Sequence, residues 1–205
     1  MRVGKYYRNR EETCVSGGTG CGVVYLSGCD MHCAYCLVYD ISQEGKGTPY
    51  TPRQLAELLC SLQQRGVSHI SLANVEPSAD EVIEAIAAAR ELGLTVPLLN
   101  NFNGYAPTAL TRRLLPFFQG YIMDFKYADA ALGARLSAVP DYPARALANL
   151  ALLSAHYGRN RYDAAGLLQS GVLLRHLILP GAWQNTEDAL RLLAANDPCG
   201  YPLSL

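Results

Sequence analysis

The sequence predicts a parallel α/β fold built as one domain. Three observations lead to this prediction: a length of 205 residues, a hydrophobic share of 50%, and short apolar runs that alternate with helical patterns. Charged residues make up only 17% of the chain, which is below the usual share of about 25% and argues against disorder. An eight-unit barrel typically needs about 250 residues. A six-strand open barrel and a doubly wound sheet both fit the pattern.

Six apolar runs are expected to form the strands. Strands that alternate with helices are typical of a parallel sheet, and such sheets place their chemistry at the carboxyl ends of the strands. The runs are residues 22–26, 69–73, 96–100, 121–125, 172–179 and 201–205.

Helices are expected between these runs, and the first of them is the best marked. Thr51 is expected to cap it, Pro52 suits the first helical position, and Gln54 completes a capping box. A second capping box is expected over residues 78–81, at the start of another helix. Further helices are expected over residues 107–115, 129–138, 144–156 and 186–195.

The composition argues against several classes of function. A net charge of −1 gives no basic field, which argues against a nucleic-acid partner. No apolar run approaches the roughly 20 residues of a membrane span, and the first residues lack the apolar segment of a signal peptide. A cytoplasmic protein without a membrane partner is therefore expected. In a reducing compartment, a cluster of cysteines indicates a metal or catalytic site before it indicates disulfides.

Three of the seven cysteines lie in one short window directly after the first expected strand. Cys29, Cys33 and Cys36 have the spacing C-x3-C-x2-C. Three thiolates on one tight loop can hold an iron–sulfur cluster and leave one metal position open, as a catalytic site needs. The alternatives are a chance spacing and a structural zinc site with His32 as fourth ligand. Zinc ligands normally come as pairs from two separate segments, whereas these residues are all local.

This window resembles the signature of the radical S-adenosylmethionine (radical SAM) superfamily, with Tyr35 as the aromatic of C-x3-C-x-aromatic-C. Later segments resemble the branch related to pyruvate formate-lyase activating enzyme. The match runs in order from about Cys14 to Gly181 and covers most of the chain. Its segments are residues 14–17, 27–29, 39–42, 124–129, 140–143 and 174–181.

The resemblance implies a fold and two cofactors. The fold is a partial (β/α)6 barrel of parallel strands, in a single radical SAM domain over residues 1–205. We expect an N-terminal extension over 1–21 and a core over 22–205 that lacks the last element of the family. In the family, three cysteines hold a [4Fe–4S] cluster and SAM chelates the fourth iron, so Cys29, Cys33 and Cys36 are the implied ligands. The reduced cluster cleaves SAM to methionine and a 5′-deoxyadenosyl radical, which abstracts a hydrogen atom from the substrate.

The resemblance also implies contacts to SAM near the cysteines and after the second strand. Tyr35 matches the aromatic that lies beside the adenine; a packed core aromatic is the alternative. Asn74 and Glu76 stand where the family has a Gly-Gly-Glu-type motif for the methionine ammonium, although both glycines are missing. Glu76 would supply charge or brace the loop, and a solvated loop glutamate is the alternative.

Further SAM contacts are implied at the ends of the next three strands. Asn101 and Asn103 are two residues apart and face the same side of an extended strand, with simple turn chemistry as the alternative. Asp124 and Lys126 form the D-x-K pair that the family uses around SAM, with a plain ion pair as the alternative. Arg175 matches a family arginine that contacts SAM, and its fork suits a carboxylate.

Other polar residues are expected to be structural. His176 faces away from Arg175 and is expected to be a satisfied core or interface histidine. Leu37 and Val38 occupy positions where the family often has an asparagine near the cofactor. Cys60 is expected to be packed, and Cys14 and Cys21 are expected to have unpaired structural roles, with a redox pair as the alternative. The sequence identifies no partner for Cys199.

Two hypotheses about function follow from these residues. The first is a radical SAM enzyme that activates a glycyl-radical enzyme by abstracting a glycine hydrogen, with flavodoxin or ferredoxin as one-electron donor. A small-molecule, peptide or RNA substrate is an alternative within this hypothesis. The second is a non-catalytic iron–sulfur protein that carries electrons or senses oxygen.

Overall fold

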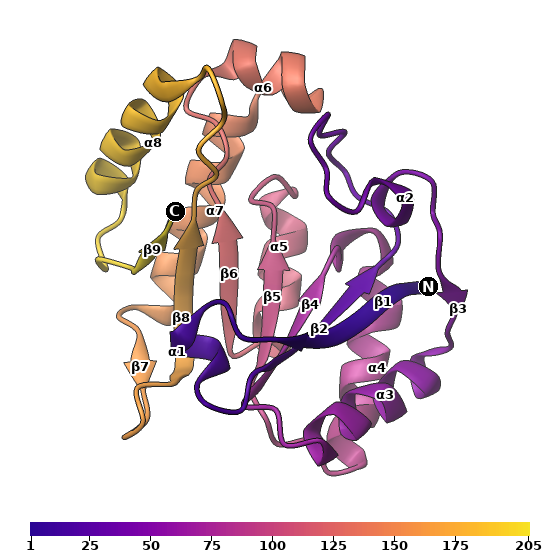
Figure 1. Cartoon of the computed structure of the whole chain (residues 1–205). Coiled ribbons are helices and arrows are strands. Elements are labelled where there is room, and N and C mark those ends of the chain that lie inside the picture. The colour runs from indigo at the N-terminus through magenta and orange to yellow at the C-terminus, as the bar shows by residue number, and fades with distance from the viewer.

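An open, curved sheet of nine strands forms the centre of the computed structural model, which describes residues 1–205 (Figure 1). Six of the strands are parallel and adjacent in the order in which they occur along the chain, so all six apolar runs of the sequence form strands as predicted. The sheet does not close, because β3 and β7 lie at its two ends. This arrangement is a partial barrel of parallel strands. The parallel strands are β2 (Cys21–Leu26), β4 (His69–Ala73), β5 (Leu98–Phe102), β6 (Gly120–Asp124), β8 (Leu168–Arg175) and β9 (Leu203–Ser204).

Three antiparallel strands at the edges were not expected from the sequence. β1 (Arg2–Asn9) pairs with β2 on one side and with β3 (Thr48–Pro49) on the other, and β7 (Arg161–Tyr162) pairs with β8. Val3 is the only buried residue of β1, so this strand has no apolar pattern by which to recognise it.

The expected helices all form, and most of them lie along the sheet, while α6 lies above the upper ends of the strands (Figure 1). Two additional helices of one turn each, α1 and α2, flank β2. No helix of the chain is long and apolar enough to cross a lipid bilayer. The helices are α1 (Thr13–Ser16), α2 (Tyr39–Ser42), α3 (Pro52–Gln64), α4 (Ala79–Glu91), α5 (Thr108–Leu114), α6 (Ala130–Ser137), α7 (Tyr142–Tyr157) and α8 (Trp183–Asn196), with 3-10 turns at η1 (Glu76–Ser78) and η2 (Leu115–Phe117).

One predicted capping box is present and the other is not. The Thr51 hydroxyl accepts from the Gln54 backbone N–H at 3.2 Å, and the Gln54 side chain accepts from the Thr51 backbone N–H at 2.9 Å. The box over residues 78–81 was wrong. The turn η1 runs directly into α4, so Ser78 lacks an extended cap conformation and makes no side-chain cap. The Glu81 carboxylate pairs instead with the N-terminal ammonium of Met1.

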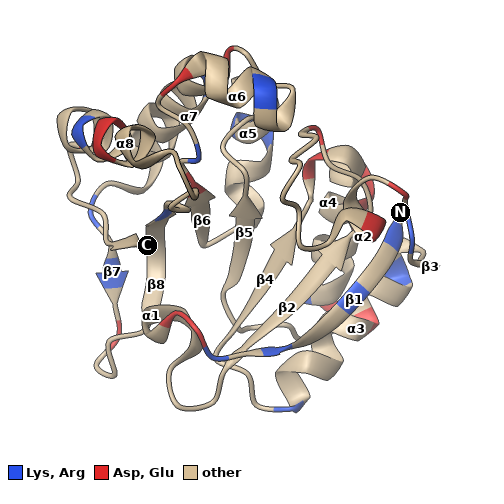
Figure 2. Cartoon of the chain, turned by 45° about the horizontal axis from the view of Figure 1, so that its top comes forward, with Lys and Arg blue, Asp and Glu red and all other residues tan.

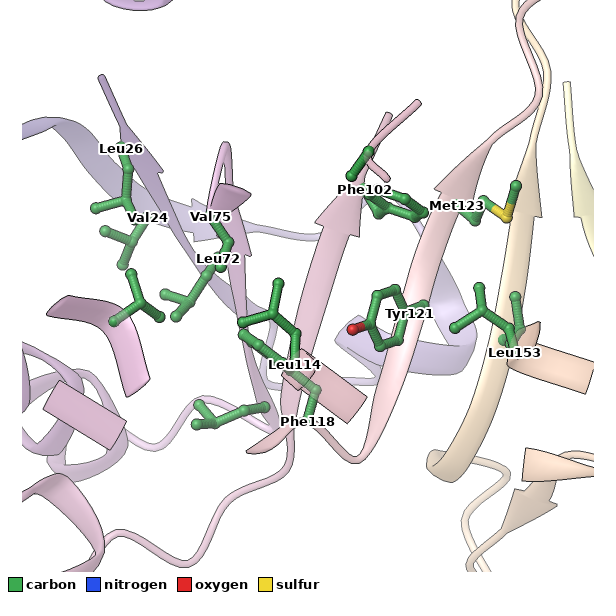
Figure 3. Packing of buried hydrophobic residues seen from close by; sticks show 14 of the residues in the cluster. Val24, Leu26, Leu72, Val75, Phe102, Leu114, Phe118, Tyr121, Met123 and Leu153 are labelled. Carbon is green, nitrogen blue, oxygen red and sulfur yellow. The ribbon is translucent and has the colours of Figure 1, made fainter. Parts of the chain in front are cut away.

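The two faces of the sheet have different roles. The face toward the helices carries the main core of 41 buried residues, part of which Figure 3 shows around Val24, Leu72 and Tyr121. The inner face carries a cluster of only five buried residues, in which Val15 of α1 packs against β5, β6 and β8. Toward the carboxyl ends of the strands, this inner face becomes polar.

Candidate functional site

A cavity of about 290 Å³ lies at the carboxyl ends of the parallel strands. In Figure 2 a charged segment marks the upper end of β6, among parallel strands that otherwise carry little charge. Every site residue predicted from the sequence except Glu76 lines this cavity. These residues are Cys29, Cys33, Tyr35, Cys36, Asn74, Asn101, Asn103, Asp124, Lys126 and Arg175.

The loop that carries the cysteines is anchored at its start and in its middle. Gly28 has φ +98, and a Cβ there would lie 3.3 Å from the Pro77 ring, so the loop turns where only glycine fits easily. The backbone N–H groups of His32 and Ala34 donate to the carbonyls of Ser137 and Leu136 at 3.0 and 2.8 Å. The end of α6 therefore holds the cysteine loop in place.

The three cysteines are free thiols whose side chains open onto one cavity. Burial raises the pKa of Cys29 to about 12 and also raises the pKa of Cys33. Without a metal these two thiols are protonated at neutral pH, and an iron ligand set would form with release of protons. No three His, Cys, Asp or Glu side chains converge on the position of a single ion. His32 is exposed and does not line the cavity, so it is not placed as the fourth ligand of a zinc site.

Each cysteine sulfur lies next to at least one polar side chain, and Cys29 Sγ also lies 3.9 Å from the carboxylate of Asp30. The Asn103 amide donates to Cys29 Sγ at 3.6 Å, and the Ser137 hydroxyl donates to Cys33 Sγ at 3.0 Å. Cys36 Sγ and the hydroxyl of Ser42 are 3.3 Å apart. These contacts fit sulfurs that carry negative charge as ligands of iron, since hydrogen bonds to such sulfurs are a usual part of iron–sulfur sites.

Asn74, which the resemblance matched to a family glycine, adopts a glycine-like backbone. Its φ is +60, in the left-handed region that asparagine tolerates better than other side chains. Its side-chain amide donates to the carbonyl of Leu26 at 3.0 Å, which ties the end of β4 to the end of β2. The missing glycine at this position is therefore compensated in backbone conformation.

Glu76 lies away from the cavity. Its carboxylate accepts from the amide of buried Asn100 at 3.1 Å. Asn100 alternates with Asn101 along β5, so it faces the helix side of the sheet. Burial raises the pKa of Glu76 to about 7. At this position the Glu76 carboxylate cannot contact a ligand in the cavity directly. It instead links the turn after β4 to strand β5, which is the bracing role that the sequence offered for it.

Asn101 and Asn103 both line the cavity, in agreement with the expected shared face. Asn103 donates to the Asp30 carboxylate at 2.6 Å, and its side-chain oxygen accepts from the backbone N–H of Tyr105 at 2.8 Å. The second contact is the turn chemistry that the sequence left as an alternative. Gly104 has φ +83, and a Cβ there would lie 2.7 Å from the Asp124 carbonyl.

A row of charges crosses the cavity from β6 to the N-terminal segment. Lys126 Nζ lies 2.5 Å from Asp124 Oδ2, and Arg175 Nη1 lies 3.8 Å from the other oxygen of Asp124. Arg175 Nε lies 3.1 Å from Glu12 Oε1 but is not aligned for a hydrogen bond. Burial alone would lower the pKa of Lys126, but the carboxylate of Asp124 outweighs it and the net shift is upward. Lys126 is therefore charged at neutral pH.

Sequence reasoning missed several residues of the site. Glu12 comes from the N-terminal segment, for which no structure was predicted. Tyr142, which is fully buried, accepts from the backbone N–H of Lys126 at 2.9 Å and is within hydrogen-bond distance of the carbonyls of Asn103 and Asp124. It thereby ties together the loops after β5 and β6. Tyr142 lies in segment 140–143, which resembles the family branch, but that resemblance assigned it no role, and no local signal marks Glu12.

His176 has the structural role that the sequence predicted. It is buried, its Nδ1 lies 2.6 Å from the carbonyl of Phe125, and its Nε2 lies 3.0 Å from the hydroxyl of Thr186. Both ring nitrogens thus have partners on the helix side of the sheet.

The comparisons with known proteins agree with this fold. A model of the radical SAM superfamily matches residues 23–115, a segment that contains all three cysteines of the window. The resemblance of the sequence to the radical SAM superfamily is confirmed over this segment, which makes up 93 of the 205 residues. The branch related to pyruvate formate-lyase activating enzyme is not singled out by the match and stays a prediction.

One curated relative and two solved structures show the extent of the similarity. The chain is 23% identical over 165 residues to the uncharacterized protein MJ0674 of Methanocaldococcus jannaschii. This alignment covers 77% of this chain and 44% of that protein. Crystal structures of Streptococcus suis SuiB, alone and bound to the precursor peptide SuiA, superpose with TM-scores of 0.60 and 0.61 at 14% identity. They cover 85% of this chain and 36% of SuiB. The chain thus spans less than half the length of these proteins, and the similarity to SuiB is one of fold.

Proposed function

We propose that this chain binds a [4Fe–4S] cluster and SAM and is an enzyme that cleaves SAM reductively. The observation that carries the proposal is the single cavity that three free cysteines share with polar residues from the ends of β4, β5, β6 and β8. When bound, the cluster supplies one electron to the sulfonium of SAM, and cleavage yields methionine and the 5′-deoxyadenosyl radical that abstracts hydrogen.

The residues of the chain have distinct tasks in this proposal. Cys29, Cys33 and Cys36 would hold three irons and leave the fourth iron for the amino and carboxylate groups of SAM. Asp124 and Lys126 suit the charged groups and hydroxyls of SAM. Both side chains are mostly buried, and the Asp124 carboxylate can pair with a positive group of the cofactor while the Lys126 ammonium can pair with a negative one. The side chains of Lys126 and Asp124 are only 16% and 19% exposed, and this partial burial strengthens electrostatic contacts to the ligand.

We propose a protein or peptide as substrate, with a flavodoxin or ferredoxin as electron donor. The branch resemblance supports activation of a glycyl-radical enzyme. The fold similarity to SuiB, whose structure is described as bound to a precursor peptide, supports a peptide substrate in the same broad class. Two exposed apolar side chains at the rim of the cavity also suit a peptide. They are Leu37, which is 99% exposed, and Leu177, which is 48% exposed, and both line the cavity.

A non-catalytic iron–sulfur protein is the second candidate. Leu37 and Val38 favour it, because they line the cavity where the family often has a polar residue near the cofactor. Such a protein would hold the cluster, and SAM would not bind to the open iron.

Anaerobic reconstitution with iron and sulfide tests the proposal. With SAM and a strong reductant, the wild-type chain is expected to form 5′-deoxyadenosine. Cys33→Ala should lose the cluster, while Cys60→Ala is a matched control, since Cys60 lies on α3 outside the cavity. An intact cluster that gives no product, and whose electron paramagnetic resonance (EPR) signal does not change on addition of SAM, would favour the second candidate.

A further inference from the structure

Three hydroxyl groups form a hydrogen-bonded chain that ends on one of the cysteine sulfurs. The hydroxyls of Tyr35 and Tyr127 are 2.6 Å apart, and those of Tyr127 and Ser137 are 2.5 Å apart. Ser137 Oγ lies 3.0 Å from Cys33 Sγ. Tyr127 and Ser137 are fully buried, so water does not compete for these contacts. We call these three residues the hydroxyl chain.

The number of protons fixes the direction of the hydroxyl chain when Cys33 is an iron ligand. A thiolate has no proton and can only accept, so Ser137 must donate to it. Ser137 then has no second proton and must accept from Tyr127. By the same count Tyr127 accepts from Tyr35. All three O–H bonds therefore point toward the sulfur, and each bond polarises the next.

We propose that Ser137 is a positioning residue that fixes the Cys33 sulfur and, backed by Tyr127 and Tyr35, raises the reduction potential of the bound cluster. This inference rests on the proposed function. Reduction adds negative charge to an iron–sulfur cluster, and hydrogen bonds to its sulfurs stabilise that charge. The hydroxyl chain lies outside the cysteine window apart from Tyr35, and it couples the aromatic of the signature to a ligand of the cluster.

The backbone around Ser137 holds the hydroxyl in place. The Ser137 carbonyl accepts from the His32 N–H and the Leu136 carbonyl accepts from the Ala34 N–H, so two backbone hydrogen bonds join the end of α6 to the cysteine loop. On the other side, a Cβ at Gly133 would lie 2.8 Å from the Val139 carbonyl, which shows how closely the end of α6 packs on the following turn. A pre-positioned donor loses little entropy when the cluster binds.

The contacts to the other two sulfurs differ from the hydroxyl chain. Ser42 lies 3.3 Å from Cys36 Sγ and is backed only by the amide of Gln43 at 3.4 Å. Asn103 lies 3.6 Å from Cys29 Sγ and shares its amide with Asp30. The contact at Cys33 is the shortest of the three.

Potentiometric titration of the reconstituted cluster, followed by EPR without SAM, tests this inference. For Ser137→Ala we expect the ratio of reduced to oxidised cluster at a fixed potential to fall about tenfold, or about 59 mV for one electron. Tyr127→Phe should give a smaller shift in the same direction, and Tyr35→Phe a smaller one still. Ser154→Ala is the matched control, because Ser154 is a buried serine of α7 whose hydroxyl has no partner.

The possible outcomes separate the two proposals. Equal potentials in wild type, Ser137→Ala and Tyr127→Phe would overturn the inference while leaving the proposed function intact. A wild-type chain that forms no cluster would overturn the proposed function itself. If Ser137→Ala lost its cluster, Tyr127→Phe would decide, since it removes one oxygen atom and leaves the donor to Cys33 in place.

Discussion

Replacement of Asn74 tests whether this residue does the work of the missing family glycine. Asn74→Ala keeps a Cβ at φ +60 and removes the amide that donates to Leu26 at 3.0 Å. The left-handed conformation costs an ordinary residue about 1 kcal/mol more than it costs asparagine, and the hydrogen bond contributes about 1 kcal/mol. The free energy of unfolding should therefore fall by about 2 kcal/mol, which lowers Tm by about 4–8 °C in a domain of this size. Asn74→Gly loses only the hydrogen bond, so its free energy of unfolding should be about 1 kcal/mol below that of the wild type.

Urea denaturation followed by circular dichroism measures these differences, and it needs no cofactor. Asn196→Ala, at an exposed asparagine of α8, is the matched control and should stay within about 0.5 kcal/mol of wild type. If Asn74→Ala were as stable as wild type, or less affected than Asn74→Gly, the explanation for the missing glycine would be refuted.

Three further predictions concern charged residues. Lys126→Ala should keep the cluster but weaken SAM binding, measured as the SAM-dependent change in the EPR signal; unchanged affinity would contradict the role given to Lys126. Glu76 has a pKa of about 7 in the folded chain, above its unfolded value, so its contribution to stability is present below about pH 4.5 and is lost as pH rises to about 7. Glu76→Gln should therefore be more stable than wild type at pH 8 and equal to it at pH 4, in denaturation at the two pH values; a constant difference would show that titration plays no part. Glu12→Gln should destabilise the fold by about 1 kcal/mol, because Arg175 keeps only the 3.8 Å contact to Asp124 and is 31% exposed. If calorimetry showed no loss of stability in Glu12→Gln, the Glu12–Arg175 ion pair would contribute nothing measurable to the fold and this prediction would be wrong.

The sequence was sufficient to predict the strands and helices of the barrel, because their apolar residues recur at regular spacing. It also predicted that Asn101 and Asn103 share a face, since side chains alternate along a strand. The alternation carries no information about β1, where Val3 alone is buried. That strand pairs with β2 through backbone hydrogen bonds and through contacts such as the stacking of Tyr7 on Tyr25, neither of which leaves a regular apolar pattern in the sequence.

The site residues that the sequence missed are those that reach the cavity from distant segments. Ser137 meets Cys33 across 104 positions of the chain, and Glu12 meets Arg175 from the opposite end of the fold. Glu76 shows the reverse problem, because a motif assigned it to the cofactor while the turn η1 directs its carboxylate to Asn100. A short motif specifies which residues are near a site, and the local turn decides where each one points.

The single turn of α1 affects access to the interior of the barrel. Val15 is 1% exposed and fills space at the base of the barrel, where it packs against Leu99, Ile122 and Leu173. A second pocket, which Glu12 and Val15 line, shares Tyr25, Asn101 and Arg175 with the cysteine cavity. The turn of α1 therefore narrows the lower approach to the cysteines without closing it, and a substrate docked on the upper rim would still leave this second side of the cavity to be covered.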